Sequence, residues 1–511
     1  MTLATRLSDA LQRLSAERLR GIRRGIEKES LRSGPSGALS LTPHPLALGA
    51  PLTHPHITTD YSESQLELIT GAHGSVEQTL GELSRIHAFV YRTLAELGEE
   101  RLWVGSMPCG LPPDENIPLG RYGSSHIGRA KSVYRMGLAH RYGRRMQTIC
   151  GIHYNWSLPG LSNDEHFALI RNFRRQSFLL LWLFGASPAV CGSFVAGREH
   201  GLQPLAQGSL YLPHATSLRM GRLGYQSEAQ SQLAVSYNSL ESYAGSLHDA
   251  MTKPYPAYEA IGIRNLGGEY NQLSTTLLQI ENEFYGTIRP KRVIRSGERP
   301  LHALLERGVE YIEVRCMDLD PFVPTGIGAP TMRFLDIFLL HCLLRASPPD
   351  TPEEIAALGR NQHRTAGFGR EPGLKLERDG REVALVDWAE EILAECAPIA
   401  AALDAALGGS AHAEALAEAN ALLARPDGLP SARALATMQR DFGGSHVQFV
   451  RAQGEQVRNH FLGLPWAPEH QAAFSAMARV SVERQAAIEA ADEGDFETFR
   501  RDYLAPERLA V

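Results

Sequence analysis

The chain has 511 residues, 43% of them hydrophobic and 21% charged, which is typical of a globular protein with two to four domains or one large domain and an annex. Its formal net charge of -6 argues against a nucleic-acid binder, which would carry a basic excess. The six cysteines lie far apart without a C-x-x-C pair, so we expect reduced thiols rather than a disulfide framework or a zinc site.

Two segments of the chain could indicate targeting or membrane contact, and neither of them does. Residues 1–20 place leucines at helical spacing with acids among the arginines, which predicts an amphipathic surface helix rather than a signal or transit peptide. The apolar stretch 178–197 is nearly long enough to span a bilayer, but Gly185-Ala186-Ser187-Pro188 interrupts it. We predict a buried helix ending near Phe184, then a turn and a buried segment. We expect a cytoplasmic protein without membrane contact, with a monomer favoured.

The stretch from Gly21 to Arg32 carries the first chemical signal. If it is a strand, its period of two places Glu27 and Glu29 on one face and Ile26 and Lys28 on the other. Two neighbouring carboxylates repel each other and favour a cation, and Mg²⁺ is a hard ion that prefers oxygen ligands. A solvated edge strand with alternating charges would show the same pattern, so this stretch alone leaves both interpretations open.

A second acidic run follows at residues 57–70. If this run is a strand, Glu67 lies on the face opposite Leu66 and Leu68 and could share a face of the sheet with Glu27 and Glu29. If it is a helix, Glu63 and Glu67 lie one turn apart on the same face. Both alternatives remain open from the sequence. The next segment, 74–97, repeats its leucines and aromatics at helical spacing and predicts a helix.

Polar residues then recur on otherwise apolar strands. A basic helical segment is expected over 129–145, and a strand over 147–158 with His153 and Asn155 on one face. A strand over 308–315 places Glu313 and Arg315 on one face. A buried histidine with its hydrogen bonds satisfied would account for the first strand equally well, and a simple ion pair would account for the second.

Arginine and lysine occupy two further segments. Residues 211–225 predict an irregular loop carrying Arg219, which could clamp a carboxylate through two hydrogen bonds or could simply be solvated. A short cationic run follows at 288–292.

Beyond about Pro348 the chain becomes rich in alanine and helical in period. Helices are predicted over 387–407, where Asp387 and Glu390 have the spacing of a capping box, and over 411–424 and 469–491. We assign residues 1–347 to a catalytic region and 348–511 to a mainly helical region packed on it. The P-loop, zincin and α/β-hydrolase motifs are absent from the sequence.

Together these strands predict an α+β fold. Strands separated by long excursions and mixed with helices indicate one antiparallel or mixed sheet, with helices outside and a polar inner face lining an active-site cleft. Mg²⁺, a nucleoside triphosphate and arginine or lysine clamps would fit such a cleft, which favours phosphoryl transfer.

Seven motifs in order make a resemblance specific. The chain resembles the proteobacterial glutamate–cysteine ligases from about Gly21 to about Leu344, through GIRRGIEKE from Gly21, ITTD from Ile57, QTICGIHYN from Gln147, GASP from Gly185, LRMGRLGY from Leu218, IRPKR from Ile288 and YIEVR from Tyr311.

The resemblance implies an ATP-dependent carbon–nitrogen ligase with a glutamine-synthetase-like carboxylate–amine ligase fold. Such an enzyme joins the glutamate γ-carboxylate to the cysteine amine through γ-glutamyl phosphate, giving γ-glutamylcysteine in the first step of glutathione biosynthesis. A carboxylate is a poor electrophile until it is phosphorylated, and the moving phosphoryl group needs its charge neutralised.

The resemblance also implies roles for individual residues. The metal ligands would be Glu27, Glu29, Asp60, Glu67, His153 and Glu313. They would hold Mg²⁺, and the imidazole would also suit Mn²⁺. The catalytic clamps would be Arg315 on the transferring phosphoryl group and Arg135 on the phosphate side. Glutamate would be bound by Arg219 and Asn155, and the cysteine wall would comprise Tyr61, Tyr134, Tyr225 and Tyr285.

Three other functions compete with this one. A ligase with another amine acceptor would use the same chemistry, a metal-dependent phosphohydrolase would use the same acids without needing amino acids, and a non-catalytic protein would bind Mg²⁺ without turnover. The paired amino-acid pockets that the resemblance implies favour the ligase.

Overall fold

The computed structural model describes residues 11–12, 14–224, 228–231, 233–295 and 297–509. Among the described helices, none combines the length and the apolar character needed to cross a bilayer. The surface helix predicted over residues 1–20 falls largely outside the described residues. Within the described part, residues 11–12 are helical and a separate helix, α2 (Ala16–Arg20), begins after its N-cap Ser15.

An antiparallel sheet lies at the centre of the molecule, in the order β2-β3-β1-β5-β10-β9 with β4 paired to β1. Its strands are β1 (Arg23–Ser33), β2 (Ile57–Thr59), β3 (Gln65–Ile69), β4 (Arg101–Leu102), β5 (Ile152–Ser157), β9 (Ile288–Lys291) and β10 (Tyr311–Met317). This confirms the predicted sheet. It also decides the open question at residues 62–70, because Glu67 lies on strand β3 and not on a helix.

One prediction of a strand was too long. Residues 146–148 form a 3-10 helix, so the strand predicted over 147–158 begins only at Ile152. Its predicted polar face is retained, because His153 and Asn155 both belong to β5.

Helices cover the outer, apolar face of the sheet. Ile26, Tyr154 and Ile312 alternate with the polar inner residues and are fully buried. The covering helices are α3 (Val76–Leu97), α5 (Asn163–Gln176), α6 (Phe178–Phe184) and α12 (Ala329–Leu344). Helix α5 begins with a capping box in which Ser162 and Glu165 bond each other's backbone.

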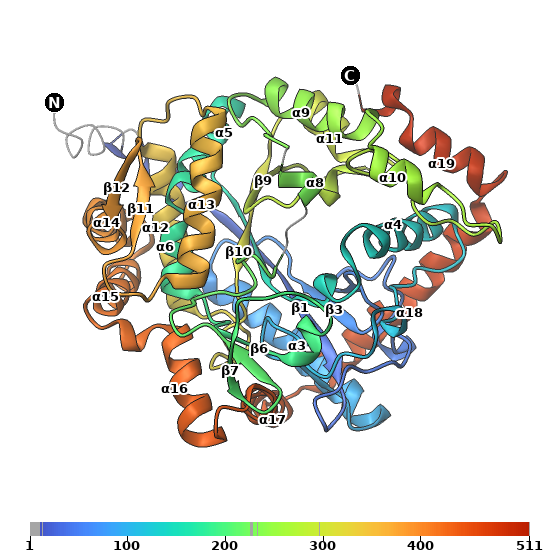
Figure 1. Ribbon diagram of the computed structural model, residues 1–511, viewed down its shortest axis with the longest axis horizontal. Helices are drawn as coiled ribbons and strands as arrows, with labels where there is room; N and C mark the ends of the chain where they lie inside the picture. Colours follow the sequence, from blue (N-terminus) through green and yellow to red (C-terminus); the bar gives the residue numbers. More distant parts are fainter. Residues whose placement is uncertain (1–10, 13, 225–227, 232, 296, 510–511) are drawn as a thin grey trace.

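The interrupted apolar stretch 178–197 forms buried core, as predicted. Helix α6 ends at Phe184 and is followed by β6 (Ala189–Cys191), which joins β7 (Gln203–Ala206) and β8 (Ser209–Tyr211) in a second sheet, and by α7 (Gly192–Val195). The chain also forms α4 (His126–Tyr142), α8 (Glu228–Ser231), α9 (Leu240–Thr252), α10 (Pro256–Ile261) and α11 (Pro300–Arg307), which lie in the upper and right part of Figure 1.

The C-terminal third is helical apart from one hairpin. It comprises α13 (Pro352–Phe368), the hairpin β11 (Lys375–Arg378) and β12 (Arg381–Ala384), then α14 (Leu385–Leu407), α15 (Ala411–Ala424), α16 (Pro430–Phe442), α17 (His446–Gly463), α18 (Pro468–Ala491) and α19 (Phe496–Leu504). Helices α14 and α15 contact α12, α17 contacts α3 and α19 contacts α4, so this third extends around the molecule (Figure 1). The predicted capping box is wrong, because α14 begins at Leu385 after Ala384, which makes no side-chain cap.

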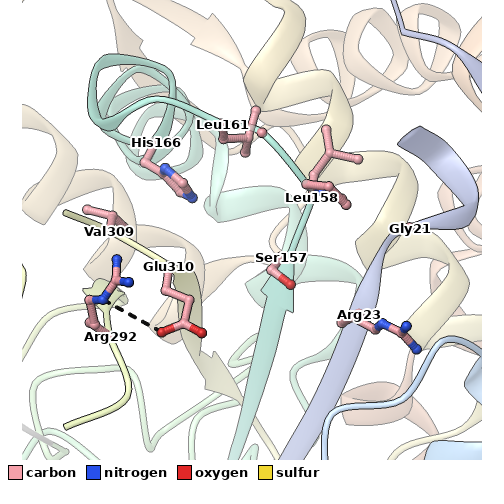
Figure 2. Close-up of a pocket in the computed structure, with 11 residues that line it drawn as sticks. Gly21, Arg23, Ser157, Leu158, Leu161, His166, Arg292, Val309 and Glu310 are labelled. Atoms are coloured by element: carbon pink, nitrogen blue, oxygen red, sulfur yellow. Dashed lines mark ion pairs between the residues drawn. The ribbon is translucent and has the colours of Figure 1, made fainter. Parts of the chain in front are cut away.

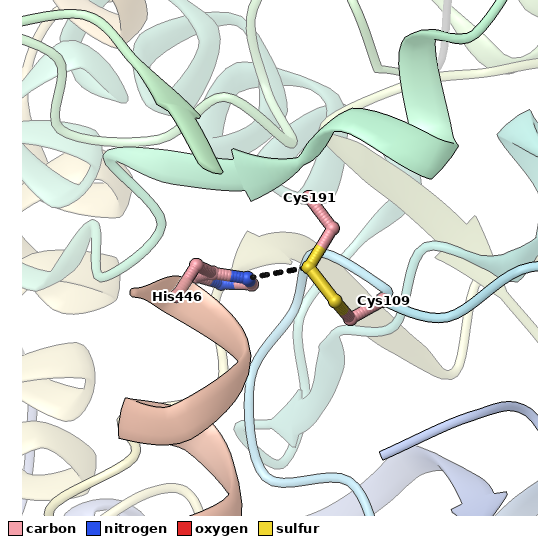
Figure 3. Close-up of side chains that lie close together, drawn as sticks. All are labelled: Cys109, Cys191 and His446. Atoms are coloured by element: carbon pink, nitrogen blue, oxygen red, sulfur yellow. Dashed lines mark hydrogen bonds between the residues drawn. A yellow bond between two sulfur atoms is a disulfide. The ribbon is translucent and has the colours of Figure 1, made fainter. Parts of the chain in front are cut away.

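One expectation about the cysteines is also wrong. Cys109 and Cys191, separated by 82 positions, form a disulfide beside His446 of α17 (Figure 3). The other four cysteines are free and buried, as expected. The pairing depends on tertiary packing, which brings the loop after β4 against β6, and spacing along the chain carries no signal for it.

Candidate active site

The inner face of the central sheet carries a continuous row of charged side chains. The register pairs Glu29 with Glu67 on β3 and Glu27 with His153 on β5. Farther along, Glu313 on β10 pairs with Asn155 on one side and Arg289 on the other. Paired residues of an antiparallel sheet project on the same side, so local alternation and strand pairing together produce this row.

This row forms one wall of a cavity of about 540 Å³. The structure brings most of the predicted residues together in its lining: Glu27, Glu29, Asp60, Tyr61, Glu67, Tyr134, Arg135, His153, Tyr285, Glu313 and Arg315. Asn155 lies beside this wall, where its Nδ2 donates to Glu27 Oε1 at 3.0 Å. Arg219 lines a neighbouring cavity, and Tyr225 lies outside the described residues.

His153 stands at the centre of the acids. Its Nδ1 lies 3.2 Å from Glu27 Oε2 and 3.7 Å from Glu313 Oε1. Its Nε2 lies 3.8 Å from Glu29 Oε1. Burial and the nearby Arg315 lower the pKa of His153, which favours the neutral imidazole, the form that coordinates metals.

The acids repel one another strongly. Burial, and then the charges of Glu27 and Asp60, raise the pKa of Glu67 well above its ordinary value. Burial and Asp60 likewise raise the pKa of Glu29 to about 8. A donor set of five carboxylates and one imidazole, packed this closely, fits divalent cations that would let every carboxylate ionise.

Cations occupy one end of the row. Lys291 Nζ lies 3.2 Å from Glu313 Oε1, and Arg315 Nη1 donates to Glu313 Oε2 at 3.0 Å. Although burial opposes ionisation, these two cations hold the pKa of Glu313 well below its ordinary value. Glu313 and Arg315 on β10 therefore form an ion pair, which was one of the two interpretations that the sequence left open. Both residues also line the cavity.

Arg219 belongs to a second cavity of about 500 Å³, which shares Tyr285 and Arg315 with the first. Arg219 is 1% exposed, so the solvated-loop interpretation is wrong. Arg219 Nη2 donates to the Arg315 carbonyl at 2.9 Å. A Cβ on Gly151 would lie 2.0 Å from this nitrogen, so glycine at that position lets the guanidinium pack against β5.

Aromatic residues line the same cavity as the acids. Gln147 Nε2 donates to the Tyr285 hydroxyl at 2.6 Å, which fixes that ring. The Tyr61 hydroxyl is buried and has no hydrogen-bond partner among the described residues. Arg135 lies over the Tyr122 ring at 4.5 Å and donates to the Asp60 carbonyl, which ties α4 to the acidic segment.

Sequence reasoning missed four cations that line the cavity: Lys131, Arg289, Lys291 and Arg295. A signal for two of them was present. In the run from Ile288 to Arg292, alternation places Arg289 and Lys291 on one face of a strand. Lys131 lies on α4, and burial followed by repulsion from Arg135 lowers its pKa to about 8.

A sheet face rich in carboxylates, with arginine and lysine at its edge, is typical of enzymes that transfer phosphoryl groups. The family follows from comparison with known proteins. The chain belongs to the glutamate–cysteine ligase family, whose model matches residues 8–365.

Relatives match over nearly the whole chain. A glutamate–cysteine ligase from Pseudomonas paraeruginosa is 49% identical over 505 residues, covering 94% of each chain. Another from Alcanivorax borkumensis is 46% identical over 524 residues, covering 98% of this chain and 99% of the relative. The crystal structure of glutamate–cysteine ligase from Francisella tularensis in complex with AMP superposes with a TM-score of 0.90 at 34% identity, covering 95% of this chain and 98% of that one.

Proposed function

We propose that this chain catalyses the ATP-dependent ligation of the glutamate γ-carboxylate to the amine of cysteine, giving γ-glutamylcysteine, the first step of glutathione biosynthesis. The observation that carries the proposal is the junction of two cavities at Arg315 and Tyr285, one lined by acids and the other by Arg219, in a member of this family. A ligase needs a phosphoryl-transfer site adjoining its amino-acid pockets, and this junction has that form.

The acids would hold the metal ions. The proposed ligands are Glu27, Glu29, Asp60, Glu67, His153 and Glu313. Their five carboxylates favour Mg²⁺, and the imidazole of His153 also allows Mn²⁺. The bound cation would neutralise charge on the phosphate oxygens of ATP and so lower the barrier to phosphoryl transfer.

The cations of the chain would act on the same charge. Arg315 lies beside Glu313 where its guanidinium can contact the transferring phosphoryl group, and Arg135 would serve the phosphate side. Arg219 would bind the α-carboxylate of glutamate, and Asn155 would orient the substrate beside Glu27. The γ-carboxylate then attacks the γ-phosphorus, ADP leaves, and γ-glutamyl phosphate forms.

The cysteine amine next attacks the acyl carbon, the C–O bond to phosphate breaks, and the amide nitrogen loses a proton. Tyr61, Tyr134, Tyr225 and Tyr285 would form the wall that receives cysteine. The ordered hydroxyl of Tyr285 and the unpartnered hydroxyl of Tyr61 support this role, since each offers a polar group on an aromatic surface.

We further propose that residues 1–347 carry the chemistry and residues 348–511 act as a scaffold. The contacts of α14 and α15 with α12, and of α17 with α3, support this division, because α12 and α3 both underlie the outer face of the sheet. We propose a cytoplasmic location, since ATP and thiol-form cysteine are both available there.

The test is ADP release from the purified protein with Mg-ATP and glutamate, with and without cysteine. We expect strong dependence on cysteine and a matching amount of dipeptide by mass spectrometry. Simple amines in place of cysteine test the acceptor. Equal ADP release without either amino acid would contradict the proposal and indicate a phosphohydrolase, and magnesium binding without any turnover would indicate a non-catalytic protein.

A further inference from the structure

The Cys109–Cys191 disulfide lies just beneath the surface of the molecule. Cys109 is 7% exposed and is followed by the exposed Gly110, and Cys191 is 4% exposed and ends strand β6. Among the described residues, no cysteine lines the two cavities of the active site or a third cavity of about 410 Å³ at the end of β5 (Figure 2). The disulfide is therefore separate from the groups proposed to take part in the reaction.

The other four cysteines are unsuited to chemistry with molecules from solution. Cys150, Cys316, Cys342 and Cys396 are all free and buried. Burial raises the pKa of each thiol, so each stays protonated near pH 7, and the thiolate is the reactive form. Within the described parts of the chain, thiol chemistry is thus confined to the disulfide.

His446 makes the two sulfur atoms of the disulfide chemically different. Its Nδ1 lies 3.6 Å from Cys191 Sγ (Figure 3). A disulfide sulfur has no proton to donate, so Nδ1 carries the proton and donates it. Burial lowers the pKa of His446 to about 4, so the ring is neutral near pH 7 and this N–H is its only one. The hydrogen bond stabilises negative charge on Cys191 Sγ, which makes it the better leaving group.

The start of helix α17 holds His446 in this position. His446 is the first residue of the helix, after the N-cap Ser445, and its backbone N–H donates to Ser209 Oγ at 2.9 Å. Ser209 on β8 is paired with Cys191 on β6. The same serine therefore joins the helix to the strand that carries the sulfur, and the amino end of α17 adds partial positive charge nearby.

Cys109 is the sulfur that a thiol from solution would reach. It lies in the irregular segment between β4 and the 3-10 helix Asp114–Asn116, beside the exposed Gly110. Cys191, in contrast, is held in a strand that pairs with β8. A small displacement of the segment around Gly110 would expose Cys109 and leave Cys191 covered.

A disulfide at this place also bears on the proposed cytoplasmic location. The cytosol keeps thiols reduced, and the disulfides that form there are usually transient, catalytic or redox-sensing. If the proposed location holds, a disulfide with one reachable sulfur and one stabilised leaving group fits exchange better than permanent cross-linking.

We propose that Cys109 and Cys191 form a site of reversible exchange with low-molecular-weight thiols, in which Cys109 is attacked and Cys191 is the leaving and resolving sulfur. The thiolate of the small thiol bonds to Cys109 Sγ, the disulfide breaks, and its electron pair goes to Cys191 Sγ, which takes up a proton from solvent. A second small thiolate attacks the sulfur of the first, which releases the Cys109 thiolate, protonated in turn, and the small-molecule disulfide. Two electrons and two protons thus pass to the protein, and oxidation follows the reverse path.

Strand β6 connects the exchange site to the cavity of Arg219. Directly before β6, the backbone N–H of Ala186 and the hydroxyl of Ser187 donate to Asp318 Oδ2 at 2.9 and 2.6 Å. Asp318 Oδ1 in turn lies 3.9 Å from Arg219 Nη1. Reduction removes the covalent link at the end of β6, so the packing around Asp318 should loosen and turnover should fall.

The experiment equilibrates the purified protein with glutathione at different ratios of thiol to disulfide, blocks free thiols and maps each cysteine by peptide mass spectrometry. At intermediate ratios, glutathione should be found on Cys109 at least about tenfold more often than on Cys191. In Cys191→Ser the adduct on Cys109 should persist, because the resolving thiol is missing, whereas the wild type should re-form its disulfide.

Variants of His446 separate its chemical role from packing. His446→Leu should slow reduction by glutathione about tenfold, since the leaving sulfur loses its hydrogen bond. His446→Asn, whose amide can return an N–H group to the Nδ1 position, is the matched control and should stay within about threefold of the wild type. Equal slowing in both variants, with both folded by thermal unfolding, would contradict the role of the hydrogen bond.

Turnover provides a second readout, which alone rests on the proposed function. The acceptor should be 2-aminobutyrate, in which a methyl group replaces the thiol of cysteine, so that the assay adds no thiol. Reduced wild-type protein should lose ADP release by at least about threefold and regain it on reoxidation. Unchanged ADP release on reduction would contradict the link through β6.

Three results would overturn the exchange site itself. One is a disulfide that stays intact in the native protein under a large excess of reduced glutathione, and another is equal adduct formation on both cysteines. The third is purified protein with both thiols free and one zinc ion per chain, because Cys109, Cys191 and His446 would then be ligands of a structural metal. Failure of the proposed ligase would appear separately, as absence of ADP release in the oxidised protein with the exchange at Cys109 intact.

Discussion

The two faces of strand β1 differ in how the charges on them are compensated. On the outer face, Arg24 Nε lies 2.7 Å from Asp336 Oδ2, and Lys28 Nζ lies 2.9 Å from both Ser30 Oγ and His87 Nε2. On the inner face, Glu27 and Glu29 stand among further carboxylates, and burial and mutual repulsion raise the pKa of Glu67. Strand alternation separates these two sets by a single residue.

The contrast distinguishes charge that stabilises from charge that serves function. A buried ion supplied with hydrogen-bond partners supports one packing arrangement, and removing a partner leaves an uncompensated charge. Clustered like charges instead reduce the stability of the protein and persist where a ligand compensates them. Four predictions test this contrast.

The largest effect is expected on the inner face. Glu27→Gln removes one charge from the proposed metal site, so kcat should fall by about a thousandfold while the melting temperature stays constant or rises. Steady-state ADP release and thermal unfolding measure the two properties. Glu382→Gln, on the exposed hairpin strand β12, is the control and should alter neither. Normal turnover in Glu27→Gln would remove this residue from the site.

The outer face should respond in the opposite sense. Asp336→Asn leaves the Arg24 guanidinium buried without its carboxylate, so the free energy of unfolding should fall by about 3–5 kcal/mol. The activity of the remaining folded protein should stay near that of the wild type. Denaturant unfolding measures the first quantity. A loss below about 1 kcal/mol would show that this ion pair does not support the outer face.

A smaller loss of activity is expected at the edge of the inner row. Arg315→Lys keeps a positive charge near Glu313 but loses the planar fork that can contact two phosphoryl oxygens. We expect kcat to fall by about a hundredfold with little change in stability. Arg360→Lys, at an exposed pair with Glu377, is the matched control. Wild-type rates in Arg315→Lys would contradict the clamp role.

The smallest expected effect is the pH dependence of the stabilisation that magnesium gives. Because the folded protein raises the pKa of Glu29 to about 8, the folded state binds more protons than the unfolded state between the ordinary carboxyl pKa and about 8. Without metal, this group therefore lowers stability as pH rises through that window. The rise in melting temperature on adding MgCl₂ should grow from pH 6 to pH 8, since the ligands must ionise. A magnesium effect independent of pH would contradict the assignment.

Much of the site could be predicted from local pattern. The strand at Gly21 to Arg32 is present as β1, and the shared faces of Glu27 with Glu29 and of Glu313 with Arg315 follow from a period of two. Glu67 could not be assigned, because its short run fits a helix or a strand until β3 pairs with β1. The capping box at Asp387 failed because α14 begins before it.

The sequence by itself determined which residue types alternate on each strand, and through ordered motifs it determined the family. Only the tertiary structure decided which strands are neighbours, and so which charges meet. The register that sets Glu29 against Glu67, the burial of Arg219 and the Cys109–Cys191 disulfide all join distant segments. Such contacts depend on chain packing over long separations, whereas periodicity records only the preferences of neighbouring residues.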